Sequence, residues 1–158
     1  MTKPTLASLL DPVQCLALGF GSGLAPRAPG TFGTLAAVPI YLLLAPLSLP
    51  LYLLVVTVLF GLGVWACDYT ATRLGVHDHP AIVWDEVVGF LVTMAAAPRG
   101  AVWVLVGFLL FRLFDVIKPW PIGLLDRRVS GGFGIMLDDL VAGLLALGVL
   151  QLLRWALA

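Results

Sequence analysis

Two short stretches of the sequence place pairs of acids directly beside apolar runs. They are WDEVVG at 84–89 and IMLDDLVAG at 135–143. The four acids are Asp85, Glu86, Asp138 and Asp139. An ionisable group beside apolar helix is costly, so each pair is a candidate functional site. Carboxylate oxygens without Cys or His partners favour Mg²⁺ or Mn²⁺ over zinc. Interaction with a helix N-terminus would explain one acid, whereas two adjacent acids indicate a bound cation.

A third stretch, FRLFDVIKPWP at 111–121, carries both signs of charge. Arg112, Asp115 and Lys118 are spaced by three residues, so a helix places them on one broad face. Pro119 ends that helix and leaves Lys118 projecting at its edge. A metal on one side with Lys or Arg on the other is the usual clamp for a phosphoryl group. A second interpretation is a charged helix terminus in which Arg112 pairs with Asp115.

The stretch GFGSGLAPRAPGTFGT at 19–34 contains five glycines and precedes a long apolar run. Successive backbone N–H groups in such a stretch can turn inward to bind an anion. Thr31 follows Pro29-Gly30 and suits a helix N-cap, and the helix start behind it is a potential phosphate site. The candidate phosphate-binding residues here are Gly30, Thr31, Gly33 and Thr34. The alternative is a flexible re-entrant turn.

The elements that must position these residues are membrane helices. Of the 158 residues, 61% are hydrophobic and 11% are charged, and soluble domains average about 25% charged residues. We expect one domain, 1–158, with an all-α fold: a polytopic membrane bundle of about four to five membrane helices, the first short or re-entrant. The expected spans are 33–46, 51–67, 82–97, 101–117 and 136–155, with a turn at 45–50 and an interfacial helix at 5–18. We expect no signal peptide.

Five spans divide the charged residues unequally between the two sides of a membrane. The side holding the N-terminus collects Lys3, Arg27, Arg73, Lys118, Arg127 and Arg128, and the other side has Arg99 and Arg154. The positive-inside rule makes the first side cytoplasmic. Every acid falls on that side: Asp11, Asp68, Asp78, Asp85, Glu86, Asp115, Asp126, Asp138 and Asp139. Five of these acids come from three helices and converge at one face. Gly89 and Gly143 would permit the helices to approach closely.

Two other arrangements resemble known sites without completing them. Cys67 and Arg73 have the C-x5-R spacing of cysteine phosphatases, but no glycine between them can wrap a phosphate. His77-Asp78-His79 could ligate a metal, and a solvated loop is the simpler interpretation. Two other functions compete with phosphate chemistry. A small transporter would use the acids as a cation site, and a structural membrane subunit would not need the acids at all.

In this order, GFGSGLAPRAPGTFGT, WDEVVG, FRLFDVIKPWPI and GGFGIMLDDLVAG closely resemble the four motifs of the bacterial phosphatidylglycerophosphatase A family. The resemblance runs from about residue 16 to residue 145. It implies a Mg²⁺-dependent lipid phosphatase of the inner membrane that converts phosphatidylglycerophosphate to phosphatidylglycerol. A multi-pass protein whose active site faces the cytoplasm follows from it. A small cation-coupled transporter remains the alternative.

We therefore expect Asp85, Glu86, Asp138 and Asp139 to hold one or two Mg²⁺ ions. Lys118 and Arg112 would clamp phosphate oxygens, together with the backbone of 30–34 and Thr31. The nucleophile is either water, with Asp115 or Asp139 as base, or a carboxylate that forms an aspartyl-phosphate. We favour water. The expected partner is the phospholipid substrate rather than a nucleic acid, and the sequence makes no prediction of oligomeric state.

Overall fold

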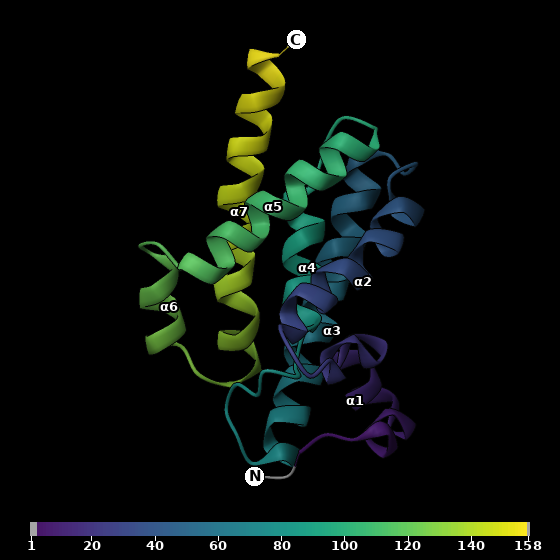
Figure 1. The fold of residues 1–158 in the computed structure, drawn as a ribbon, viewed down its shortest axis with the longest axis vertical. Coiled ribbons are helices and arrows are strands. Elements are labelled where there is room, and N and C mark those ends of the chain that lie inside the picture. The colour runs from purple at the N-terminus through teal and green to yellow at the C-terminus, as the bar shows by residue number, and fades with distance from the viewer. Residues whose placement is uncertain (1–2, 158) are drawn as a thin grey trace.

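The computed structural model describes residues 3–157, apart from the side chain of Asp126, so the sequence prediction made for that acid lies outside the described residues. The described elements are 3₁₀-helices η1 and η2 and α-helices α1 to α7, joined by turns (Figure 1). They span η1 Leu6–Leu10, α1 Pro12–Ala17, η2 Gly19–Leu24, α2 Pro29–Leu44, α3 Leu49–Leu74, α4 Trp84–Thr93, α5 Ala101–Ile117, α6 Ile122–Arg128 and α7 Gly131–Ala156. The all-α prediction is confirmed for this part of the chain.

The short helix α4 lies at the centre of the fold. Nearly all of its side chains are buried, and it packs against α7, α2 and α3. Figure 1 shows α7 upright, with α5 crossing it obliquely and α6 lying to one side of it. The hydroxyl of Tyr52 on α3 donates to the Leu91 carbonyl at 2.6 Å, and the Trp84 indole N–H donates to the Leu59 carbonyl at 3.1 Å. These hydrogen bonds fix both ends of α4 against α3.

Two glycines set the contact between α4 and α7. A Cβ atom on Gly143 would lie 2.5 Å from the carbonyl oxygen of Gly89, and one on Gly89 would lie 2.8 Å from the Asp139 carbonyl oxygen. The Thr93 hydroxyl lies 3.0 Å from the Gly89 carbonyl and 3.4 Å from that of Gly143. The backbones touch, as small residues at a helix interface allow. This contact brings the acids of the two helices together.

Two of the described helices, α3 and α7, are long and apolar enough to cross a membrane, which is fewer than the four to five expected. Each has 26 residues. The predicted span 82–97 is instead the ten-residue α4, only about 15 Å long. It ends early because the chain turns at Met94–Ala97, where Ala96 has a positive φ of 55°. Helices α2 and α5 have 16 and 17 residues, near the lower limit of about 17 for a tilted span.

Helix α2 begins earlier than the sequence predicted. Ala28 precedes it with a left-handed backbone (φ 48°), and Pro29 occupies the first helical position, which its fixed φ suits. Thr31 therefore lies inside the first turn and is not the N-cap, contrary to the prediction. The helix continues through Pro39 to Leu44 without a break, so the described segment is not a re-entrant turn.

Other helices are longer than the sequence predicted or are divided in two. The predicted span 51–67 extends to Leu74, and the span 136–155 begins at Gly131. The predicted interfacial helix 5–18 is divided into η1 and α1 because Asp11 caps a new helix that starts at Pro12. Helix α6 forms within what was expected to be a loop. The predicted span 101–117 coincides with α5.

Candidate active site

Four helices meet around a cavity of about 410 Å³. Its wall is formed by the N-terminus of α2, the first turn of α4, the C-terminal end of α5 and the third turn of α7. It brings together eight of the predicted site residues, all except Thr31, Gly33 and Thr34: Gly30, Asp85, Glu86, Arg112, Asp115, Lys118, Asp138 and Asp139. The three charged motifs therefore form one site, although they come from separate parts of the sequence.

Three carboxylates of this cavity lie close to one another. One oxygen from each of Asp85, Glu86 and Asp139 lies within 4.8 Å of the others. Asp85 is 9% exposed and Asp139 is 2% exposed. Each of the three side chains also has a buried oxygen without a hydrogen-bond partner among the described residues: Oδ1 of Asp85, Oε2 of Glu86 and Oδ2 of Asp139. Buried charges without partners are very costly, so this donor set fits a divalent cation such as Mg²⁺.

Asp138 has a different local environment from the other three predicted metal ligands. Its Oδ2 lies 2.6 Å from Nζ of Lys118, which forms a salt bridge between α7 and the end of α5. Lys118 adopts a left-handed backbone (φ 45°) and caps α5. Pro119 follows it and disfavours further helix at that position. The helix terminus thus turns the ammonium group toward α7.

Arg112 lies between two acids. Its guanidinium pairs with the Asp115 carboxylate one turn along α5 and lies 3.9 Å from Oε1 of Glu86. The pairing of Arg112 with Asp115, which the sequence left as an alternative, is therefore present. Gly30 makes this arrangement possible, since a Cβ atom there would lie 2.1 Å from Glu86 Oε1 and 3.0 Å from Arg112 Nη1.

The other residues predicted from the glycine-rich stretch do not line the cavity. Gly33 packs against Val83, where a Cβ atom would lie 2.6 Å from the valine Cβ. The hydroxyl of Thr34 is buried and donates to the Gly30 carbonyl at 2.9 Å. Thr31 is partly buried in the first turn of α2. Their place in the structure is in helix packing, and only Pro29 and Gly30 of this helix reach the cavity.

Residues 15–154 match the family model described as Phosphatidylglycerophosphatase A. The chain belongs to this family. It is 49% identical over 150 residues to Phosphatidylglycerophosphatase A of Escherichia coli K12, covering 93% of this chain and 87% of the relative. Identity to Phosphatidylglycerophosphatase A of Haemophilus influenzae is 44%, covering 94% and 92% of the two chains. No solved structure matches the chain.

In this phosphatidylglycerophosphatase A family member, the cysteine arrangement is not a catalytic site. Cys67 is fully buried, and its Sγ lies 3.9 Å from Sδ of Met136. The Arg73 guanidinium stacks 4.8 Å from the ring centre of Tyr69. Neither residue lines the acidic cavity. The spacing that resembled a cysteine phosphatase therefore arises by coincidence.

The sequence interpretation missed one acid of the cavity in this family member. Asp78 lines it from the loop between α3 and α4. Its neighbours explain the position: Nε2 of His77 accepts the Gly131 N–H at 2.7 Å, and Nδ1 of His79 accepts the Ala81 N–H at 3.1 Å. Both histidines accept hydrogen bonds from backbone N–H groups, and the bond from Gly131 keeps the loop beside the start of α7. The adjacent histidines were the only sequence signal that this loop is fixed.

Proposed function

We propose that this chain hydrolyses phosphatidylglycerophosphate to phosphatidylglycerol and inorganic phosphate, in phospholipid biosynthesis. The observation that supports this most directly is the acidic cavity of a phosphatidylglycerophosphatase A family member. Three buried carboxylates with unpartnered oxygens share that cavity with Arg112 and Lys118. Acids for a metal and cations for phosphate oxygens are the parts that phosphoryl transfer requires.

Asp85, Glu86 and Asp139 would hold Mg²⁺, and Asp138 would complete the set or serve a second ion. When bound, the ion would polarise the phosphate oxygens and offset the negative charge that builds up during the reaction. The oxygen-only donors and their burial support Mg²⁺ over zinc. The remaining chemistry belongs to residues of the chain itself.

Arg112 and Lys118 would bind the terminal phosphate. In the structure they pair with Asp115 and Asp138, and a phosphate monoester would compete for the same donors because it carries more charge than one carboxylate. The N-terminus of α2 at Pro29 and Gly30 would add the positive end of a helix to this pocket. We propose no direct phosphate contact for Thr31, Gly33 or Thr34, since they lie outside the cavity.

Once Arg112 turns to the phosphate, Asp115 would be left to accept a proton from water. The water oxygen forms a bond to phosphorus, the bond from phosphorus to the glycerol oxygen breaks, and that oxygen takes up a proton. Asp139 is the alternative base, and direct attack by a carboxylate is the alternative nucleophilic route. We favour water with Asp115 because Asp115 borders the cavity beside the phosphate-binding cations.

We further propose that the protein is a multi-pass protein of the bacterial inner membrane, with α2 and α5 as short tilted segments beside α3 and α7. A row of exposed apolar side chains along α5 supports this: Val102, Leu105, Leu109, Leu113 and Val116. The charge distribution supports an active site at the cytoplasmic face. The acyl chains of the substrate would then stay in the bilayer while the terminal phosphate enters the cavity.

The proposal is tested by measuring phosphate release from phosphatidylglycerophosphate by the detergent-purified protein. We expect turnover with Mg²⁺, loss of turnover in EDTA, and recovery when Mg²⁺ is restored. Cys67→Ser should retain activity. Activity that survives chelation and is abolished by Cys67→Ser would overturn the proposed site. No turnover together with cation flux in liposomes would favour the transporter.

A further inference from the structure

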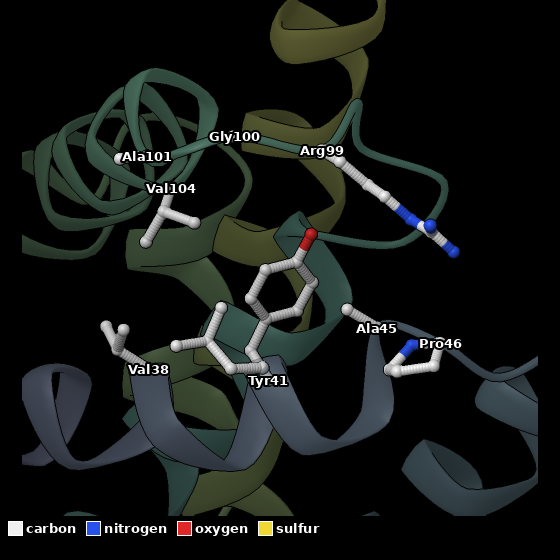
Figure 2. Close-up of a pocket in the computed structure, with 9 residues that line it drawn as sticks. Val38, Tyr41, Ala45, Pro46, Arg99, Gly100, Ala101 and Val104 are labelled. Carbon is white, nitrogen blue, oxygen red and sulfur yellow. The ribbon is translucent and has the colours of Figure 1, made fainter.

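A second cavity, of about 500 Å³, lies between the C-terminal half of α2 and the start of α5. Its wall is mostly apolar and includes Val38, Ala45, Pro46 and Val104 (Figure 2). Two residues supply polar groups, Tyr41 and Arg99. The cavity therefore combines an apolar surface with one positively charged side chain.

This second cavity, called the groove below, is remote from the acidic cavity. The groove includes the start of α5 at Ala101, whereas the acidic cavity includes Asp115. The fourteen positions that separate these two residues correspond to about 21 Å along the helix. In the membrane arrangement proposed above, on which this inference rests, the groove faces the leaflet opposite the active site.

The charge at this end of the molecule is positive and is not balanced by nearby acids. Arg99 is exposed and forms no ion pair with another residue that the structure describes. Nη1 of Arg154 lies 3.3 Å from the Ala96 carbonyl, so a second guanidinium borders the same turn. The residues that the structure describes in the cavity lining include no Asp or Glu. An anion is the complement to such a surface.

Tyr41 is held in place within the groove. Its ring packs edge-on against Phe90 with 6.2 Å between the ring centres, and the residue is 4% exposed. Figure 2 shows its hydroxyl pointing toward the segment that carries Arg99 and Gly100. A fixed hydroxyl and a nearby guanidinium can bind one phosphodiester from two directions.

We propose that this groove binds an anionic phospholipid of the leaflet opposite the active site. One acyl chain lies along the apolar wall at Val38 and Val104, and the phosphodiester contacts Arg99 and the Tyr41 hydroxyl. Neither contact requires a phosphate monoester, so a phosphodiester lipid, which the active site would not hydrolyse, satisfies both.

The test compares phosphatidylserine with phosphatidylcholine of the same acyl chains, bound to the delipidated protein and measured by native mass spectrometry. We expect one phosphatidylserine to bind about tenfold or more tightly than phosphatidylcholine, because both lipids carry the phosphodiester but phosphatidylcholine adds a cation that Arg99 and Arg154 repel. Arg99→Gln should remove that preference, and Arg99→Lys should restore part of it. Val104→Trp, which fills the apolar wall while keeping the charge, should weaken both lipids.

Two matched variants locate the lipid. Arg154→Gln should have a smaller effect than Arg99→Gln, and Lys118→Gln at the acidic cavity should leave the preference intact. Equal binding of the two lipids, or a preference lost in Lys118→Gln and kept in Arg99→Gln, overturns the proposal. Turnover of phosphatidylglycerophosphate is measured on the same preparation. Binding at Arg99 without turnover would contradict the proposed function alone.

Discussion

Asp139 lies at the centre of the acidic cluster and illustrates how its charges are arranged. The two cations of the cavity pair with Asp115 and Asp138, and Arg112 also lies 3.9 Å from Oε1 of Glu86. Asp85, Glu86 and Asp139 nevertheless each keep one buried oxygen without a hydrogen bond to any described residue. A protein that needed these acids only for stability would be expected to pair them or replace them with apolar residues. These unpartnered oxygens are consistent with the divalent ion proposed above.

Asp139→Asn should therefore separate metal binding from folding. We expect turnover to fall about a hundredfold or more because a ligand of the metal is lost. In EDTA the variant should be as stable as the wild type or more stable, since one buried charge has been removed. The stabilisation by Mg²⁺ should disappear. Thermal unfolding with Mg²⁺ and with EDTA measures this, and a variant with unchanged turnover and an unchanged response to Mg²⁺ would contradict it.

Among the elements, α5 and α4 show what local sequence can and cannot predict. Both ends of α5 follow local signals, Gly100 before it and Lys118-Pro119 after it, and its bounds match the prediction. Helix α4, by contrast, ends early at the turn formed by Met94–Ala97, where Ala96 has a positive φ of 55°. Hydropathy reports the apolar run but not the turn that ends the helix. The close approach of α4 and α7 was predicted from the sequence because Gly89 and Gly143 are small.

Gly143→Ala should disrupt the contact between α4 and α7. Its Cβ would lie 2.5 Å from the Gly89 carbonyl oxygen and 3.2 Å from Cβ of Val92. Overpacking of this kind costs about 1–3 kcal/mol. The proposed metal-binding acids lie on the same two helices, so a shift between the helices would displace these acids. Turnover should therefore fall about tenfold or more.

Gly148→Ala is the matched control on the same helix, because a Cβ there meets nothing within 4 Å. It should raise stability by up to about 1 kcal/mol, the gain expected for alanine over glycine in a helix. Thermal unfolding in detergent and phosphate release compare the two variants. Equal effects of both substitutions would show that the contact does not position the acids.

The carboxylate of Asp11 links helix α1 to the rest of the fold. Asp11 accepts the Val13 N–H at 2.9 Å, the Gln14 side-chain amide at 3.1 Å and the Tyr69 hydroxyl at 2.9 Å. The Gln14 hydrogen bond, with those from Tyr69 and the backbone, holds the pKa of Asp11 below its ordinary value of 3.8. The carboxylate thus stabilises the fold above that pH, and this contribution is lost as the pH falls through the lowered pKa.

Asp11→Ala should accordingly lower the melting temperature at pH 7 and have a smaller effect at pH 3. The difference between wild type and variant, followed by thermal unfolding at both pH values, is the quantity to compare. Tyr69→Phe removes one hydrogen bond while keeping the cap and should show an intermediate effect. A difference that does not shrink in acid would contradict the role of the ionised carboxylate.

At the scale of the whole molecule, the candidate site could be predicted further than the fold. The acids and cations of the site could be recognised because charged residues are rare in this chain, and they line one cavity as expected. Gly33 and Thr34 were assigned to phosphate because their residue types suit loops, whereas the structure uses them for packing against Val83 and within α2. Asp78 was missed because its position depends on His77 holding the start of α7. Residue type predicts chemistry, and only the packed structure shows which residues face one another.

The proposed orientation makes the two ends of the molecule accessible from opposite sides. Single cysteines at Arg99 and Arg128, in a Cys15→Ser/Cys67→Ser background, test this. We expect a membrane-impermeant maleimide to label Arg99→Cys in intact spheroplasts and Arg128→Cys only after permeabilisation. The reverse pattern would place the acidic cavity on the outer face and contradict a cytoplasmic active site.

The charge of the acidic cavity lining also predicts the order in which Mg²⁺ and the lipid bind. Among the residues that the structure describes, six carboxylates and two side-chain cations line it, so an incoming phosphate monoester would meet net repulsion. We therefore expect the proposed divalent ion to bind before the lipid. Initial-rate kinetics in which the Mg²⁺ and lipid concentrations are both varied should therefore show compulsory ordered binding. Saturating lipid should then not restore turnover when Mg²⁺ is absent.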